Sequence, residues 1–178
     1  LENCLNDSQE IDIKSLFSKL NDIHLEFRPN HQVLELYLNG KNINKEIREL
    51  RVSNNVSIVA KQPEIRDFLL DFQRNLATKG GVIMDGRDIG TVILPNADFK
   101  FFVTASPVER ARRRHLQLQN AGTEVSYEEV FQNLITRDKI DSERDVAPLK
   151  QADDAILIDN TFLNKEETIA LILSYIEK

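Results

Sequence analysis

The chain has 178 residues, of which 41% are hydrophobic and 29% charged, a balance that suits one domain with a buried core and small insertions. Its 23 Lys and Arg against 29 Asp and Glu give a net charge of −6, which argues against a general nucleic-acid-binding protein. A single cysteine, Cys4, excludes an internal disulfide and a cysteine-based metal site and fits a reducing compartment, the cytoplasm, while the short apolar runs predict no membrane span.

The first sixty residues are predicted to form small elements. In chain order these are a short amphipathic helix, two β-prone runs that make a hairpin, and two polar helices: 11–20, 23–28 with 33–38, 43–50 and 52–60. Turn-forming residues mark the hairpin, with Pro29-Asn30 between the strands and Asn39-Gly40 after the second.

The rest of the chain is predicted to alternate helices with short buried strands. Pro63 suits the first turn of a helix that Gly80-Gly81 ends, and Ser126 with Glu129 forms a capping box for a later helix. The expected elements are a helix from 63, strands at 82–84 and 99–103, an arginine-rich helix from 107 to the break at 122, a helix from 126 to about 138, a strand at 155–158 and a helix at 164–176. This order predicts an α/β fold with a parallel sheet and helices on its faces.

The densest cluster of charged residues is the turn Asp85-Gly86-Arg87-Asp88-Ile89-Gly90-Thr91, which lies between two apolar runs. Ligands of open α/β sheets bind beyond the carboxyl ends of the strands, where Arg87 could hold a phosphate with two hydrogen bonds. An aspartate in this turn could accept hydrogen bonds from an exocyclic amine or approach a hydrated Mg²⁺. A surface turn with an internal salt bridge explains the same composition equally well.

Two further groups of charged residues each allow a functional interpretation and a purely structural one. Arg137, Asp141 and Arg144 share one face if their segment is helical, and could clamp a phosphate and a sugar, although spacing alone favours an ion-pair ladder on a solvated face. Four arginines precede the Gly122 break and could close over a triphosphate: Arg110, Arg112, Arg113 and Arg114. A basic helix end explains them as well, and a nucleic-acid patch would lack interleaved aromatics.

No P-loop motif, Gly-x-x-x-x-Gly-Lys-Ser/Thr, occurs in the 178 residues. Lys41 follows Gly40, but Glu35 stands where the first glycine should be and Asn42 where the hydroxyl should be.

The sequence resembles the bacterial-type cytidylate kinases (CMP kinases) over almost its whole length. The most specific motif is Asp85-Gly86-Arg87-Asp88-Ile89-Gly90-Thr91-Val92, leading to Pro95-Asn96-Ala97-Asp98. The other matching segments are 35–40 with 46–48, 52–57, 63–66, 73–74, 137–138 with 141, 144 and 146–149, and 152–155 with 158–159.

The resemblance implies phosphoryl transfer from ATP, with its Mg²⁺, to CMP or dCMP by a monomer that needs no nucleic-acid or membrane partner. It implies a P-loop nucleoside monophosphate kinase-like parallel sheet with helices on both faces, a monophosphate-binding insertion in 1–60, a core in 61–178 and a lid near 110–124. Metal contact is expected at most through water, at Asp85.

By family match, the cytosine would be bound by Ser57, Arg66 and Asp88. Arg87 and Arg144 would hold the CMP phosphate, and Arg137 and Asp141 the ribose. Arg110, Arg113 and Arg114 would meet ATP from the lid. The residues expected to act in catalysis, by alignment and charge stabilisation, are Arg87, Asp88, Arg137 and Arg144.

Family members begin with a strand, the P-loop, its helix and a second strand, and these are not found here. The first strand is central in the family's sheet, so its absence would leave a gap between the strands expected at 82–85 and 99–103 and leave backbone groups unpaired. The chain starts at Leu1 without a leader, and we expect a fragment of a longer polypeptide that is inactive alone. The alternatives are a non-catalytic nucleotide-binding relative without the loop, and an interaction module that uses the arginines.

Overall fold

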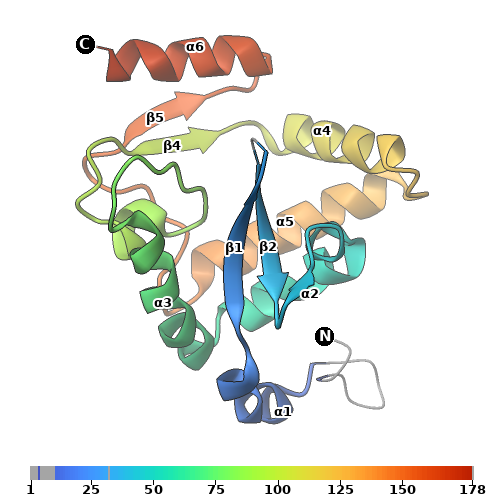
Figure 1. The fold of residues 1–178 in the computed structure, drawn as a ribbon. Helices are drawn as coiled ribbons and strands as arrows, with labels where there is room; N and C mark the ends of the chain where they lie inside the picture. The colour runs from blue at the N-terminus through green and yellow to red at the C-terminus, as the bar shows by residue number, and fades with distance from the viewer. Residues whose placement is uncertain (1–3, 5–10, 32, 178) are drawn as a thin grey trace. The chain divides into compact units, whose positions relative to one another are not determined.

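The computed structural model describes residues 4, 11–31 and 33–177. The chain folds into two compact units, Leu1–Asn75 and Leu76–Lys178, and the boundary falls inside helix α3, Pro63–Ala77 (Figure 1). The functional division into a lobe at 1–60 and a core at 61–178 stays a prediction.

The first unit is built around the predicted hairpin. Its elements in chain order are α1 (Ile13–Ser18), η1 (Leu20–Asp22), β1 (Leu25–Asn30), β2 (Val33–Leu38), β3 (Lys41–Asn42), η2 (Glu46–Arg48), α2 (Leu50–Ala60) and most of α3. β1 and β2 are antiparallel, in a register that pairs Leu25 with Leu38 and Asn30 with Val33. The turn prediction at Pro29-Asn30 was wrong, because both residues belong to β1 and the reversal lies after Asn30.

Two asparagines shape the segment after β2. Asn39 and Gly40 have φ of 50° and 78°, the left-handed pair that a tight hairpin turn requires, and they lead into the short strand β3 that the sequence did not indicate. Asn44 accepts a hydrogen bond from the Leu36 amide at 3.1 Å. Because side-chain bonds of this kind compete with helix formation, the helix expected at 43–50 is reduced to the single turn η2.

Helix α3 begins at Pro63, as predicted, and buries apolar side chains. Ile65 is buried, and the Phe72 ring stacks on Phe27 of β1 with 6.0 Å between ring centroids. This contact packs the helix against the hairpin within the first unit.

The second unit contains a small parallel sheet and three long helices. Its elements are η3 (Ile89–Ile93, a π-helical turn), β4 (Phe101–Thr104), α4 (Pro107–Asn120), α5 (Tyr127–Glu143), β5 (Ile156–Asp159) and α6 (Lys165–Ile176). β4 and β5 pair in parallel from Phe101–Ile156 to Thr104–Asp159, which confirms the predicted α/β class with parallel strands.

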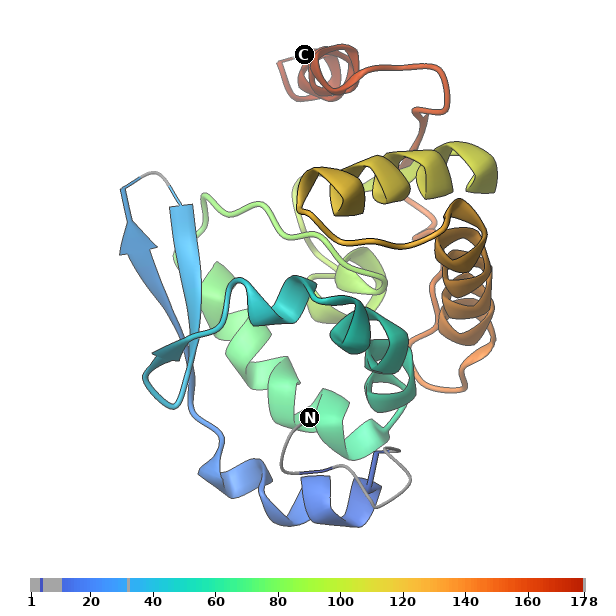
Figure 2. The same ribbon diagram turned by 90° about the vertical axis from the view of Figure 1, so that its right-hand side faces the viewer.

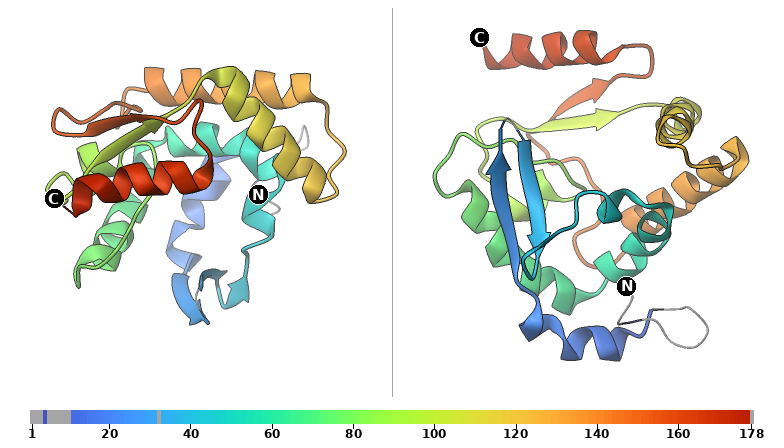
Figure 3. Two further views of the ribbon diagram at one scale, coloured as in Figure 1. Left: turned by 90° about the horizontal axis from the view of Figure 1, so that it is seen from above. Right: turned by 45° about the vertical axis from the view of Figure 1, so that its right-hand side comes forward.

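Two contacts show how the helices of this unit pack. α4 packs against α5 (Figure 2). α6 runs beside the strands, where the Tyr175 ring lies 6.3 Å from Phe101 (Figure 3). No helix in the described ranges is long and apolar enough to cross a membrane.

The strand predicted at Val82–Met84 was wrong. These residues have no regular secondary structure, and Ile83 is fully exposed. A strand needs a hydrogen-bonded neighbour, and none of the described strands of this unit pairs with them. The nearby apolar residues Val92 and Ile93 belong to η3 instead.

Helix α5 extends further than predicted. The Ser126–Glu129 capping box opens it as expected, but the helix continues past 138 to Glu143, since neither glycine nor proline interrupts this stretch. Arg137 and Asp141 therefore lie on its last turns, and Arg144 is its C-cap.

Candidate functional site

Four of the predicted site residues in the second unit form one group, which we call the charge cluster: Arg87, Asp88, Asp141 and Arg144. Arg87 Nε donates a hydrogen bond to Asp141 Oδ2 at 3.2 Å. Arg144 Nη1 lies 3.6 Å from Asp141 Oδ1, and its Nη2 lies 3.8 Å from Asp88 Oδ1. The structure thus brings together residues more than fifty positions apart in the sequence.

The backbone around the cluster explains how these side chains are held. Asp88 starts the turn η3, and its carbonyl accepts the Val92 amide at 2.9 Å and the Ile93 amide at 3.2 Å. At the other side, the Arg144 guanidinium donates to the carbonyl of Ala147, from Nε at 2.8 Å. Ala147 has a left-handed φ of 49°.

Burial separates the members of the cluster. Asp88, Asp141 and Arg144 are buried, whereas 44% of the Arg87 side chain is exposed. Buried charges are costly unless they are paired, and here two arginines balance two carboxylates. Asp141 and Arg144 therefore do not form an ion-pair ladder on a solvated face, because both are buried. Arg87 is the member of the cluster that an anion can reach from solvent.

Arg137 lies one helical turn before Asp141 on α5 and is partly buried. Burial lowers the pKa of its guanidinium from the ordinary value, and the positive charges of Arg87 and Arg114 lower this pKa further. An anion beside these arginines would relieve that repulsion. The region therefore favours a phosphate-bearing ligand on electrostatic grounds.

The three arginines assigned to ATP have different contacts. Arg110 pairs with Asp138 of α5, with 2.7 Å between Nη1 and Oδ2. Arg114 donates from Nη1 to Gln117 Oε1 at 2.7 Å, within α4.

Arg113 reaches the loop that follows β5. It donates to the carbonyl oxygens of Asn160 at 2.8 Å and Leu163 at 3.1 Å, and its Nε bonds to Glu109 at 2.7 Å. Hydrogen bonds from Arg112 and Arg113 lower the pKa of Glu109 to about 2.

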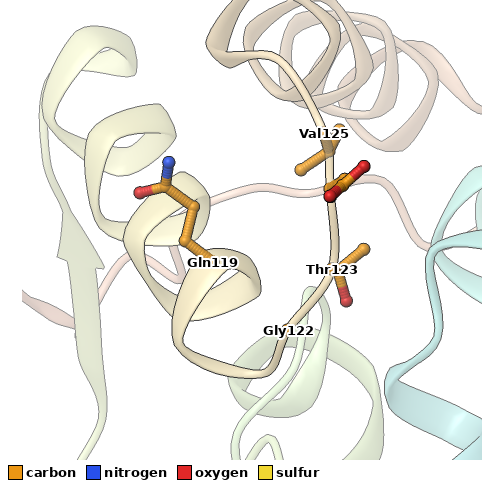
Figure 4. A pocket seen from close by; sticks show the side chains of 5 residues that line it. Gln119, Gly122, Thr123 and Val125 are labelled. Atoms are coloured by element: carbon orange, nitrogen blue, oxygen red, sulfur yellow. The ribbon is translucent and has the colours of Figure 1, made fainter.

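Two open hollows lie near this arginine-rich helix. One, of about 360 Å³, is lined by Glu109, Arg112, Arg113, Thr161, Phe162, Leu163 and Asn164. The other, of about 430 Å³, lies where α4 meets the loop to α5 and is lined by Gln119, Gly122, Thr123, Glu124 and Val125 (Figure 4). Only the first contains a predicted site residue, Arg113.

The first unit holds the other two predicted residues, Ser57 on α2 and Arg66 on α3. Ser57 is only 3% exposed, and its Oγ has no hydrogen-bond partner among the described residues. Arg66 Nη1 donates to the Ala60 carbonyl at 3.1 Å. An unsatisfied buried hydroxyl is costly, so the Ser57 Oγ suits a ligand that supplies the missing partner.

The described residues offer no group of three or more His, Cys, Asp or Glu side chains able to hold a metal ion. Asp85 is exposed and stands three residues before Asp88. A water-mediated role for Asp85 stays a prediction, and no reaction step is assigned to a metal held by this chain.

Sequence reasoning missed Lys100, which lies directly before β4 and bonds to Asp154. The only signal in the sequence is a lone lysine before an apolar strand, and such a pattern does not identify its partner.

Comparison with known proteins agrees with the family resemblance of the sequence. Residues 3–178 match the family model described as "Cytidylate kinase". A protein named "Cytidylate kinase" from Flavobacterium johnsoniae is 48% identical over 165 residues, which are 92% of this chain and 72% of the relative. One of the same name from Exiguobacterium sp. is 46% identical over 164 residues (92% and 73%), and one from Carboxydothermus hydrogenoformans is 44% identical over 176 residues (99% and 78%).

Proposed function

The chain belongs to the cytidylate kinase family, and on this premise we propose that it binds CMP or dCMP as the acceptor of a phosphoryl group from ATP. The observation that carries the proposal is the charge cluster. It is electrically balanced and mostly buried, and it presents the exposed Arg87 beside two further arginines, Arg114 and Arg137.

The phosphate of the acceptor would bind to Arg87. The guanidinium is planar and can offer two parallel hydrogen bonds to phosphate oxygens. Asp141 already holds Arg87 through its Nε, which leaves the two terminal nitrogens to face the ligand. Arg144, which contacts Asp88 and Asp141, would be the second arginine that binds this phosphate.

The ribose and the base would use the remaining assignments. Arg137 and Asp141 would bind the sugar hydroxyls. Ser57, Arg66 and Asp88 would bind cytosine, whose donor amine beside acceptor atoms calls for a carboxylate together with hydrogen-bond donors. The buried and unsatisfied Ser57 Oγ supports this part of the proposal.

The ATP side would be served by the lid arginines Arg110, Arg113 and Arg114, all three of which also contact protein groups. Mg²⁺ would arrive with ATP and neutralise phosphate charge. The chain's own contribution is alignment of the acceptor phosphate and stabilisation of the transferring charge by arginines. A CMP phosphate is ionised at neutral pH, so no general base is needed.

We further propose that these 178 residues bind CMP but do not turn it over, because they contain no P-loop motif. The exposed apolar side chains of Val82, Ile83 and Val103 support the idea that a further strand completes the sheet. A non-catalytic relative would show the same CMP binding, but its natural full-length form would also lack turnover.

The test is a calorimetric titration of the chain with CMP, dCMP and UMP, together with an assay of ADP formation from ATP. CMP and dCMP are expected to bind more tightly than UMP. Equal binding of UMP would contradict the assignment of Asp88 to cytosine. Turnover by the 178 residues would contradict the inactivity and keep the kinase assignment.

We also propose that the protein is a cytoplasmic monomer with no nucleic-acid or membrane partner. Size-exclusion chromatography tests the monomeric state, and nucleic-acid titration tests the lack of nucleic-acid binding. Binding to nucleic acid that falls steeply with salt and ignores CMP would favour an interaction module instead.

A further inference from the structure

Lys100 is a nearly buried lysine whose ammonium is fully engaged. Its side chain is 9% exposed. Nζ donates to both carboxylate oxygens of Asp154, at 2.8 Å and 2.6 Å, and to the carbonyl of Pro95. The hydrogen bond to Lys100 lowers the pKa of the Asp154 carboxyl.

The aliphatic part of Lys100 contacts a second part of the same segment. A Cβ added to Gly90 would lie 3.2 Å from Lys100 Cδ, so the lysine stem packs directly on this glycine. Gly90 belongs to η3 and Pro95 follows it closely. Lys100 therefore touches the turn in its interior and just beyond its end.

The turn held in this way begins with Asp88. Its carbonyl accepts the amides of Val92 and Ile93, so the position of Asp88 follows that of the turn. A π-helical turn is uncommon and depends on surrounding contacts for its stability.

The other end of this link is the sheet. The Lys100 carbonyl accepts the Ile156 amide of β5 at 2.9 Å, which continues the pairing of β4 with β5. Asp154 lies two residues before β5. Lys100 thus joins the segment that carries Asp88 to the paired strands of the second unit.

We propose that Lys100, held by Asp154, is a positioning residue that fixes Asp88 for recognition of the acceptor's base. The inference rests on the proposed function, in which Asp88 reads the cytosine amine. Weakening Lys100 is then expected to reduce the discrimination between CMP and UMP. A purely structural role would weaken all ligands alike.

The test uses the whole chain with three variants. Lys100→Met keeps the stem and removes the charge, and Asp154→Asn keeps the lysine but weakens its ion pair. Asp153→Asn is the matched control, because Asp153 is an exposed neighbouring carboxylate. Calorimetry with CMP, UMP and ribose 5-phosphate gives the affinities, and hydrogen exchange of the Val92 and Ile93 amides reports on the turn itself.

For Lys100→Met, CMP is expected to bind about tenfold more weakly while ribose 5-phosphate changes by less than about twofold, so that the preference for CMP over UMP narrows. Asp154→Asn should show a smaller change in the same direction, and Asp153→Asn none. Exchange of the Val92 and Ile93 amides should rise about tenfold in Lys100→Met.

An unchanged CMP-to-UMP ratio, or an equal loss for all three ligands, would overturn the proposal. Asp154→Asn decides the matter alone if Lys100→Met does not fold. If the wild-type chain binds no CMP, the proposed function fails, and the amide exchange still tests the anchoring: faster exchange supports it and unchanged exchange overturns it.

Discussion

The Arg113 guanidinium donates a hydrogen bond to the main-chain oxygen of Asn160 at 2.8 Å, and so joins the middle of α4 to the loop that follows β5. The same side chain bonds to the Leu163 carbonyl and to Glu109. Its neighbour Arg112 is 57% exposed, against 36% for Arg113, and among the described residues its hydrogen bonds go to Glu109. Adjacent arginines of one basic run therefore differ in role.

Replacing Arg113 by methionine is expected to lower the free energy of unfolding by about 2 kcal/mol, because two carbonyl oxygens lose a charged donor. Arg112→Met removes the same charge one residue earlier and should change stability by less than about 0.5 kcal/mol. Urea unfolding followed by circular dichroism measures both. Equal effects of the two variants would contradict the structural role of Arg113.

Acid should weaken the start of α4. The pKa of Glu109 is lowered from 4.5 to about 2, first by its hydrogen bond with Arg112 and then by that with Arg113. Since the folded-state value lies below the unfolded one, the contribution of Glu109 to stability is fully present above pH 4.5 and is lost as the pH falls toward about 2.

Thermal unfolding of the wild type and Glu109→Gln across this range tests the point. The difference in Tm should stay constant above about pH 5 and shrink steadily below it. Glu166→Gln changes a first-turn carboxylate of α6 and controls for the loss of one negative charge. A difference that grows on acidification would show that Glu109 is not the titrating group.

Local structure could be predicted from the sequence, but long-range contacts such as those of Arg113 could not. Local signals predicted local structure: Ser126 with Glu129 gave the start of α5, and Asn39-Gly40 the turn after β2. The partner of Arg113 is 47 residues away, and no spacing rule identifies a contact that depends on how two elements pack.

The error at Val82–Met84 has a related cause. Apolar β-prone residues predict a strand, yet a strand forms only where a neighbour supplies hydrogen bonds. The composition of the turn at 85–91 identified the segment of Arg87 and Asp88 but not its π-helical form, which depends on contacts such as that of Gly90 with Lys100.

Ser57 offers a test in which stability and binding should separate. Its hydroxyl is buried and has no partner among the described residues, so Ser57→Ala should leave stability unchanged or raise it by up to about 1 kcal/mol. CMP should bind about tenfold more weakly, since the proposed bond to cytosine is lost. Ribose 5-phosphate, which has no base, should bind the variant and the wild type equally.

Thermal unfolding and calorimetry together decide this prediction. A clear loss of stability in Ser57→Ala would mean that the hydroxyl already has a partner in solution. Equal losses for CMP and ribose 5-phosphate would remove Ser57 from the base-binding set.

Asp141 is expected to matter most for the integrity of the charge cluster. Asp141→Asn removes the carboxylate that accepts from Arg87 Nε and lies beside the buried Arg144; the side chains of Arg144 and Asp141 are 3% and 5% exposed. Arg144 then keeps only Asp88 as its counterion, and breaking a buried ion pair costs about 3 kcal/mol, so the free energy of unfolding should fall by that order. Asp138→Asn is the control on the same helix: its pair with Arg110 is partly exposed, and its removal should cost less than about 1 kcal/mol. Added phosphate should restore part of the stability lost in Asp141→Asn, because an external anion can then neutralise Arg87, and an absence of such rescue would argue against an anion site at the cluster.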